Sequence, residues 1–281
     1  MKQRSNPLSW ITVDDADLSV DEFPDGSFRF TVNYTGTYSS HVGPELVVRL
    51  KTTLPEAIIA AYQVCVALLN SYADCYITVI VQTMPDQRAD RSETPGMTNA
   101  AAVSAHILAN IPCNELIVFD LHSNVAKTVL ESECAYDGKK LTINGPLECF
   151  LETLNDCDID PSMKIDYIVA VDGGAVARAE EVAKHFGAEV IYCDKKRVDG
   201  KVVGHKLIAG PAKISPTSTI WVVDDLCDGG ATFISVAKLV RSHYSFFELN
   251  LYVTHGLFSK GKEELFQYYT TILALFDYSE V

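Results

Sequence analysis

Short runs of apolar, β-branched residues alternate along the chain with stretches whose apolar positions recur at helical spacing. Six runs have the character of buried strands: residues 76–82, 116–119, 167–171, 190–192, 219–223 and 249–253. Uniformly apolar runs are typical of parallel strands covered by helices on both faces. Helical spacing appears at residues 55–70, 98–110, 175–186 and 232–241. The pattern predicts an α/β fold in which mainly parallel sheets are flanked by helices.

The length of the chain, 281 residues, allows two domains of ordinary size. Gly145-Pro146 is a turn signal near the middle, and the polar stretch 155–162 follows a short segment of helical character. We therefore expect an N-terminal domain over residues 1–145 and a C-terminal domain over residues 146–281.

The composition, 48% hydrophobic and 21% charged residues, is that of a globular protein. A net charge of −14 repels nucleic acid and anionic membrane surfaces, so neither is an expected partner. No signal peptide is readable, and no apolar run reaches the roughly 20 residues that a spanning helix requires. The eight cysteines include no C-x-x-C pair, which favours a reducing cytoplasm over a zinc site or a disulfide framework.

Polar clusters follow the predicted strands. The clusters are Asp86 to Arg91, Asp120-Leu-His122, Asp172-Gly-Gly, Asp194-Lys195-Lys196-Arg197, Asp224 to Thr232, and Thr254-His-Gly. In open α/β sheets, ligands bind outside the carboxyl ends of the strands. The clusters therefore predict a ligand site at that edge.

The segment from Trp221 to Thr232 is the most specific of these signals. Asp224 and Asp225 follow an apolar strand, and their oxygens suit sugar hydroxyls or the water shell of a metal ion. The glycine-rich turn that follows offers backbone N–H groups and a helix N-terminus to a phosphate. An acidic turn that only caps a helix is the alternative. Acids next to Val222-Val223 would be desolvated, which favours a bound cation instead.

This segment resembles the phosphoribosyl diphosphate binding loop shared by phosphoribosyltransferases and phosphoribosyl diphosphate synthetases. The other clusters resemble the synthetases in particular: Asp120-Leu-His122, Asp172-Gly-Gly, Lys195-x-Arg197 and Thr254-His-Gly-Leu-Phe-Ser259. Phe23-Pro-Asp-Gly26 and Arg88-x-Asp90-Arg91 also fall in family order. The resemblance spans about residues 20–260 and implies two phosphoribosyltransferase-like domains.

What the resemblance implies is a Mg²⁺-dependent diphosphokinase. In such synthetases the anomeric hydroxyl of ribose 5-phosphate attacks the β-phosphorus of ATP, and AMP leaves. Phosphoryl transfer requires mainly positioning and charge neutralisation. The family's active sites are completed by a neighbouring subunit, so a homo-oligomer is expected. The implied residues are Lys195, Arg197 and His122 for catalysis; Phe23, Asp25, Arg88, Asp90, Arg91 and His122 for ATP; His122 and Asp172 for Mg²⁺; and Asp224, Asp225, Asp228, Gly229, Gly230, Ala231 and Thr232 for the sugar phosphate.

Several of these residues have a structural alternative. His122 after an apolar strand is compatible with a core histidine, and Lys195-Lys196-Arg197 with a solvated surface run. Phe23 is compatible with a core anchor beside a Pro-Asp-Gly turn. Arg178 is interpreted as a residue that solvates a helix, and it stays outside the predicted site.

The sequence also departs from the family pattern. Ser27 stands where an acidic residue is usual, and Ala89 where a glutamine is usual, so adenine recognition is predicted to be altered. Gly229 stands where family loops commonly carry threonine. A hydroxyl that grips the terminal phosphate is then missing, and the smaller residue leaves room beside the loop. This makes ADP-ribose a second candidate acceptor, as in synthetase-like viral enzymes that rebuild NAD⁺.

Two other departures concern regulation. Val32-Asn-Tyr-Thr-Gly36 does not keep the family's Val-Arg-Gly, and the sequence stops earlier than is usual in the family. The resemblance is therefore to a short, divergent member, in which allosteric control by phosphate and ADP is not expected.

Two other functions compete with the diphosphokinase. A phosphoribosyltransferase shares the loop from Asp224 to Thr232 but does not explain Lys195-x-Arg197 together with Asp120-Leu-His122. A regulatory homologue that has lost turnover usually lacks part of the Lys-x-Arg loop or the metal ligands, and all four positions are present here. The diphosphokinase is therefore the main prediction.

Overall fold

The computed structural model describes residues 6–37, 43–72, 74–92, 94–198, 201–246 and 248–279. The chain divides into two compact units, Met1–Asn144 and Gly145–Val281. The division falls where a strand ends at Asn144 and a helix begins at Pro146. Proline suits this first helical position, because the N–H it lacks would have no partner within the helix.

The N-terminal unit is built on a five-stranded sheet of order β1-β4-β5-β6-β7. Strands β4 to β7 are parallel, and β1 is antiparallel to β4. The sheet strands are β1 (Ile11–Val13), β4 (Glu45–Leu50), β5 (Tyr76–Val81), β6 (Glu115–Phe119) and β7 (Lys140–Asn144). The other elements are η1 (Pro7–Ser9), the antiparallel ribbon of β2 (Ala16–Glu22) and β3 (Phe28–Tyr34), and the helices α1 (Glu56–Ser71), α2 (Ala100–Ala109) and α3 (Asn124–Tyr136).

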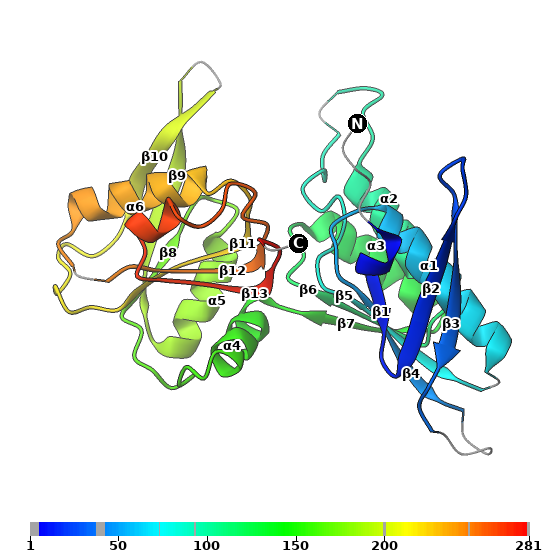
Figure 1. Cartoon of the computed structure of the whole chain (residues 1–281). Helices are drawn as coiled ribbons and strands as arrows, with labels where there is room; N and C mark the ends of the chain where they lie inside the picture. The colour runs from blue at the N-terminus through cyan, green and yellow to red at the C-terminus, as the bar shows by residue number, and fades with distance from the viewer. Residues whose placement is uncertain are drawn as a thin grey trace. The chain divides into compact units, whose positions relative to one another are not determined.

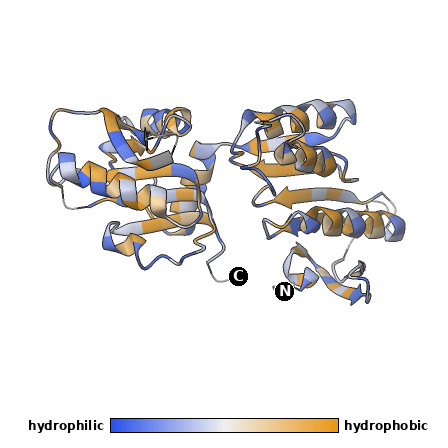
Figure 2. Cartoon of the chain, turned by 90° about the horizontal axis from the view of Figure 1, so that it is seen from above, coloured by the Kyte–Doolittle hydropathy of each residue, from blue (hydrophilic) through white to orange (hydrophobic). Residues whose placement is uncertain are grey.

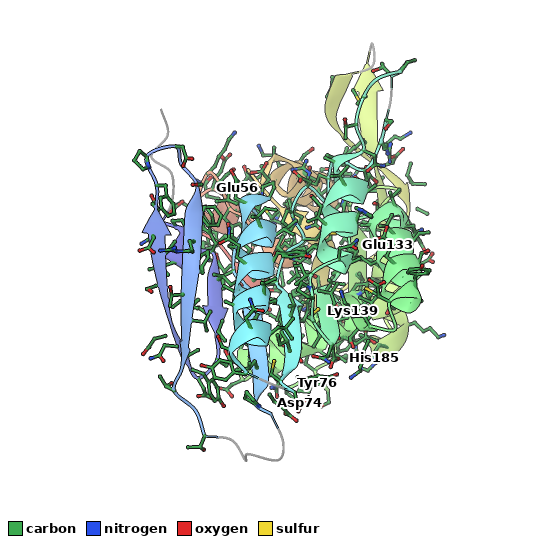
Figure 3. The ribbon with its side chains drawn as sticks, turned by 90° about the vertical axis from the view of Figure 1, so that its right-hand side faces the viewer. Glu56, Asp74, Tyr76, Glu133, Lys139 and His185 are labelled. Carbon is green, nitrogen blue, oxygen red and sulfur yellow. The ribbon has the colours of Figure 1, made fainter. Side chains whose placement is uncertain are left out.

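Polar contacts between side chains and backbone join the elements of this unit around its apolar core. The β2–β3 ribbon packs on α1, where Gln63 Nε2 donates to the carbonyl of Phe28 at 3.2 Å. Lys139 Nζ donates to the carbonyls of Ala109 and Ile111, which ties the turn after α3 to the end of α2 (Figure 3). In Figure 3 the turn between β2 and β3 lies at the same end of the unit as Glu56, where α1 begins. That end is the carboxyl edge of the parallel strands.

The C-terminal unit is built on a six-stranded sheet of order β10-β9-β8-β11-β12-β13. All neighbours are parallel except β10, which is antiparallel to β9. In Figure 1 the β9–β10 pair projects past the neighbouring strands as a two-stranded arm. The elements are α4 (Pro146–Asp156), β8 (Tyr167–Ala170), α5 (Val176–Phe186), β9 (Glu189–Val198), β10 (Lys201–Ala209), β11 (Ile220–Cys227), α6 (Ala231–His243), β12 (Asn250–Gly256), η2 (Leu265–Gln267) and β13 (Thr271–Asp277).

The hydrophobic runs of the sequence form the centres of the two sheets, which appear as orange strands in Figure 2. Val222 and Leu251 on adjacent strands are fully buried, as are Val79 and Leu116 in the other unit. Packing of this kind supplies most of the free energy of folding. Among the described residues, no helix combines the length and the apolar character needed to cross a membrane.

The six predicted strands and four predicted helices are confirmed, but several polar clusters lie inside strands and not after them. β9 continues to Val198, β11 to Cys227 and β12 to Gly256. The ladder continues because Asp224 pairs in register with Val253, and Cys227 with Gly256. Backbone hydrogen bonding therefore extends each strand through its polar residues.

Candidate active site

Asp172 and Lys195 form an ion pair at the carboxyl edge of the C-terminal sheet. Asp172 follows β8, and its Oδ1 accepts the backbone N–H of Gly174 at 2.9 Å and of Ala175 at 3.3 Å. Its Oδ2 lies 2.6 Å from Lys195 Nζ. Burial favours a raised pKa for Asp172, but the hydrogen bond and charge of Lys195, with the two N–H groups, outweigh burial and lower the pKa. The pair joins a residue predicted for metal binding to one predicted for catalysis.

Lys195 lies on the projecting arm, opposite His205 in the β9–β10 pairing. The His205 Nδ1 atom is 2.9 Å from Ser235 Oγ on α6, which fastens the arm to that helix. The side chain of Lys196 is exposed, so the surface-run alternative fits this residue. The surface-run alternative does not fit Lys195, which forms an ion pair with Asp172. The backbone of Arg197 belongs to β9, but its side chain lies outside the described residues.

Asp224 and Asp225 lie side by side in β11 and share one guanidinium group. Arg178 Nη1 is 3.9 Å from the Oδ1 atoms of both aspartates. Burial and the neighbouring charge of Asp225 raise the pKa of Asp224 well above its ordinary value, and Arg178 offsets part of that effect. The side chain of Arg178 is only 10% exposed. Its interpretation as a helix-solvating residue is therefore wrong, because α5 directs it toward the acid pair.

The predicted sugar-phosphate loop, Asp228 to Thr232, leads into the N-terminus of α6. Gly230 has a φ of +76°, a conformation that favours glycine. The segment after β12 is hydrogen-bonded to the loop, because Ser259 Oγ donates to Asp228 Oδ1 at 2.5 Å and Ser259 N donates to the Asp228 carbonyl at 3.2 Å. The dipole and first N–H groups of α6 make this end of the helix suited to an anion.

The space that the sequence predicts beside Gly229 is occupied by another side chain. A Cβ atom placed on Gly229 would lie 3.4 Å from the Cδ and Cε atoms of Lys260. The aliphatic stem of Lys260 therefore lines this side of the loop. The expectation of an open space was wrong because Lys260 comes from a segment 31 positions further along the chain, which folds back on the loop.

In the N-terminal unit, His122 and the cluster after β5 are brought together by Gln87. Gln87 is buried, and its Oε1 accepts the backbone N–H of His122 at 3.3 Å. The His122 side chain is exposed, so the core-histidine alternative is wrong. Asp120 is buried with a φ of +34°, and its N–H donates to the Asn144 carbonyl at 2.8 Å. These contacts fix the loop after β6 while the imidazole faces solvent.

The cluster from Asp86 to Arg91 is fastened to the start of α2. Asp86 Oδ2 accepts Ser104 Oγ at 2.7 Å, and the carbonyl of Asp90 accepts Asn99 Nδ2 at 2.7 Å. Arg91 Nε lies 3.8 Å from Asp90 Oδ1. Arg88 and Arg91 are both exposed.

Phe23 occupies the turn between β2 and β3, and its side chain is 44% exposed. The Arg29 guanidinium carbon lies 5.8 Å from the centre of its ring. The core-anchor alternative is therefore wrong. Asp25 Oδ1 accepts both Ser27 Oγ at 2.7 Å and Ser27 N at 2.9 Å, and these bonds lower the pKa of Asp25. Ser27, the departure from the family pattern, thus holds the neighbouring acid in the turn.

The structure joins Asp172 to Lys195, and it joins the Asp86–Arg91 cluster to the loop of His122 through Gln87. His122 and Asp172, the predicted metal pair, belong to different units, so their convergence stays a prediction. Sequence reasoning missed Gln87, His205, Arg178 and Lys260. Gln87 lies within the polar cluster from Asp86 to Arg91, so its place in the sequence could have indicated it. His205 lies in β10, whose mixed polar pattern did not indicate a strand, and the other two are located only by the tertiary fold.

The donor set at the acid pair is compatible with Mg²⁺. In the described part of the chain, no three His, Cys, Asp or Glu side chains gather as a metal cluster. Magnesium, however, is typically held by one or two carboxylates with substrate phosphates and water. Two neighbouring carboxyl groups that share one guanidinium offer oxygens to a further cation, and a bound cation would favour their charged form. Asp224 and Asp225 therefore fit such an ion.

A parallel sheet whose strand carries an acid pair into a glycine turn at a helix N-terminus is suited to binding a phosphorylated ligand. Residues 156–274 match the family described as phosphoribosyl transferase domain. The whole-chain fold resembles the phosphoribosylpyrophosphate synthetase from Mycobacterium smegmatis, with a TM-score of 0.66, 18% identity, and coverage of 89% of this chain and 76% of that one.

Sequence comparison finds similar proteins that all carry one name. The chain is 28% identical over 203 residues to the ribose-phosphate pyrophosphokinase of Maricaulis maris, covering 71% of this chain and 60% of that protein. It is 27% identical over 223 residues to ribose-phosphate pyrophosphokinase 3, chloroplastic, of Arabidopsis thaliana, covering 76% of this chain and 49% of that protein. The chain is similar to ribose-phosphate pyrophosphokinases and spans only about half to 60% of the length of these two relatives. The predicted fold class is confirmed.

Proposed function

We propose that the protein is a Mg²⁺-dependent diphosphokinase that transfers the β,γ-diphosphate of ATP to the anomeric hydroxyl of ribose 5-phosphate. The products would be phosphoribosyl diphosphate and AMP. The observation that carries the proposal is the placement of Lys195. Its ammonium lies at the strand edge 2.6 Å from Asp172, in the same unit as the acid pair and the sugar-phosphate loop. The names of the similar proteins support ribose 5-phosphate as the acceptor.

We assign acceptor binding to the C-terminal domain, residues 146–281. The loop N–H groups and the dipole of α6 bind the 5′-phosphate, and the oxygens of Asp224 and Asp225 accept the ribose hydroxyls. Lys195 exchanges Asp172 for the migrating phosphoryl group, whose negative charge it neutralises. Arg197, the other cation predicted for catalysis, is assigned the same role.

We assign ATP binding to the N-terminal domain, residues 1–145. Phe23 offers an exposed aromatic face to the base, and Arg88 and His122 are exposed polar groups. Asp25, Asp90 and Arg91 complete the predicted set. Bound Mg²⁺ would neutralise phosphate charge: the oxygens of Asp224 and Asp225 fit the ion, and His122 and Asp172 are the ligands that the resemblance implies. A homo-oligomer would place one subunit's Arg88 against the base held by another's Phe23.

The direct test is incubation of the purified chain with ATP, Mg²⁺ and ribose 5-phosphate, followed by separation of nucleotides by ion-exchange chromatography. We expect AMP and phosphoribosyl diphosphate in equal amounts, and neither product when EDTA replaces Mg²⁺. Release of pyrophosphate from phosphoribosyl diphosphate and a base, without AMP in the first reaction, would favour a phosphoribosyltransferase. Absence of both reactions with correctly folded protein would favour a regulatory homologue.

ADP-ribose is the second candidate acceptor, and Gly229 is the observation that favours it. The threonine hydroxyl of the family loop is missing there, and the stem of Lys260 that covers the glycine is an exposed, flexible side chain. The same assay with ADP-ribose in place of ribose 5-phosphate gives the ratio of kcat/KM values. A ratio above one would make ADP-ribose the preferred acceptor.

Oligomeric state and compartment complete the proposal. Sedimentation velocity on the purified chain tests for the expected dimer or larger assembly. All eight cysteines are free thiols, which supports a reducing cytoplasm as the compartment.

A further inference from the structure

Lys260 lies directly beside the sugar-phosphate loop. Its Cδ and Cε atoms are 3.4 Å from the Cβ position of Gly229. The ammonium is one covalent bond beyond Cε, so the positive charge is close to the loop. Gly229 is also the position where the family's threonine hydroxyl is missing. The aliphatic stem of a lysine therefore lies against the loop at the position that has lost a neutral donor.

The backbone around Lys260 is held in place. Leu257 N donates to the Cys227 carbonyl at 2.8 Å, and Ser259 makes its two hydrogen bonds to Asp228. On the other side, Gly261 N donates to the Phe258 carbonyl at 2.7 Å, and Phe258 has a φ of +43°. These contacts position the backbone of Lys260 at the loop, so binding a ligand would require little ordering of the backbone in this segment.

The charge of Lys260 has no carboxylate partner within the described part of the chain, although the net charge is −14. Lys262, two residues later, is different. Its Nζ lies 2.6 Å from Asp277 Oδ2 and 5.1 Å from the centre of the Phe258 ring. The two lysines are therefore a natural pair for comparison, because the charge of Lys262 is engaged within the fold and the stem of Lys260 lies against the loop.

We propose that Lys260 binds the 5′-phosphate of the acceptor sugar and selects for phosphorylated acceptors in place of the missing threonine hydroxyl. This inference rests on the proposed function and adds a specificity-determining residue to it. A lysine ammonium is a compact charge with three donors, and charge-assisted hydrogen bonds to phosphate are stronger than those from a neutral hydroxyl. The ligand class is a sugar with a 5′-phosphate, either a monoester, as in ribose 5-phosphate, or a diphosphoester, as in ADP-ribose.

The test compares ribose 5-phosphate with ribose as acceptors for the wild type, Lys260→Gln and Lys262→Gln. For Lys260→Gln we expect the KM for ribose 5-phosphate to rise about tenfold with kcat within about twofold, since a lost contact to a charged group affects binding first. The KM for ribose should not change, because ribose has no phosphate to lose. Lys262→Gln should leave both values as they are. Parallel runs with ADP-ribose show whether the monoester or the diphosphoester depends more on Lys260.

Restoring the family residue gives a second, independent measurement. The backbone of Gly229 is outside the left-handed region, and its Cβ would meet Lys260 at ordinary contact distance, so Gly229→Thr is compatible with the fold. In the Lys260→Gln background, Gly229→Thr should lower the KM for ribose 5-phosphate at least about threefold, because the hydroxyl returns a donor to the phosphate.

Calorimetric titration of ribose 5-phosphate into each variant measures binding without turnover. We expect about tenfold weaker binding for Lys260→Gln. Equal binding by wild type and Lys260→Gln, or an equal loss for ribose and ribose 5-phosphate in the kinetic assay, would overturn the role of Lys260 while AMP release still supported the diphosphokinase. If no acceptor gave AMP but Lys260→Gln bound ribose 5-phosphate more weakly, the proposed reaction would fail and the phosphate site would stand.

Discussion

The two units share a parallel sheet flanked by helices, yet their candidate site residues differ in how far they engage one another. In the C-terminal unit the charged groups engage one another: Asp172 with Lys195, and Arg178 with Asp224 and Asp225. In the N-terminal unit Phe23, Arg88 and His122 are exposed. Buried charges must be paired, whereas aromatic and cationic groups at the surface stay accessible to a ligand. The C-terminal unit thus holds a prearranged charge network, and the N-terminal unit presents accessible side chains.

The largest expected effect comes from Lys195→Ala, which removes the cation on the arm. We expect kcat for AMP release to fall by about 10³–10⁵-fold, the range found when one transition-state cation is removed in phosphoryl transfer. Single-turnover kinetics with radiolabelled ATP measures this loss. Lys196→Ala, a change at the exposed neighbour, should retain nearly full activity. Equal losses in the two variants would contradict the specific role of Lys195.

The next effect concerns the charge network itself. Arg178→Met leaves two buried carboxylates without their shared guanidinium, so the free energy of unfolding should fall by about 3–5 kcal/mol. Urea denaturation followed by circular dichroism measures the change. Lys184→Met, at an exposed position in the last turn of the same helix, is the control and should change stability by less than about 0.5 kcal/mol. A stable Arg178→Met variant would mean that the network is not prearranged.

Phe23→Ala tests the exposed aromatic side chain of the N-terminal unit. Losing an aromatic face that stacks on a base should raise the KM for ATP about tenfold, with thermal stability nearly unchanged because the ring is exposed. Steady-state kinetics and a melting curve measure both quantities. Phe266→Ala, at a similarly exposed ring in the other unit, should leave the KM alone. A large drop in melting temperature for Phe23→Ala would instead assign the ring a structural role.

The smallest expected effect is a gain in stability, for the substitution Asp224→Asn. The folded-state pKa of Asp224 is raised, so the stability that its protonated form contributes is present at low pH and is lost as the pH rises through the raised pKa. Asp224→Asn removes this dependence. The variant should be more stable than the wild type by about 1 kcal/mol at pH 7.5 and similar to it near pH 4, while acceptor binding weakens.

Asp166 provides the matched control for that prediction. Its pKa is lowered, mainly by the side chain of Lys164 at 2.5 Å and also by the N–H of Thr219, despite an opposing effect of burial. Asp166→Asn should therefore lose stability at pH 7.5 relative to the wild type. Denaturation curves at both pH values compare the two variants, and a change of the same sign in both would refute the electrostatic explanation.

The sequence predicted the parts of the fold that depend on local hydrophobic pattern. β5, β6, β8 and β11 are apolar runs, and their burial in parallel sheets follows from that pattern. β10 and the β2–β3 ribbon mix polar and apolar residues, so only their pairing partners make them strands. Within the site, motif order indicated Asp172, Lys195 and Asp224. The positions of Arg178 and Lys260 depend on how α5 and the segment after β12 pack, which no local pattern contains.

The antiparallel strand β10 has a practical consequence for work on this protein. It covers the edge of β9 and completes the backbone pairing of the arm. A deletion of β10 would leave the backbone N–H and C=O groups along one edge of β9 without hydrogen-bond partners. Strands of separate molecules can pair with such an edge, and the protein then aggregates. Truncated proteins would then lose solubility together with turnover, so single substitutions are the sound way to dissect this part of the molecule.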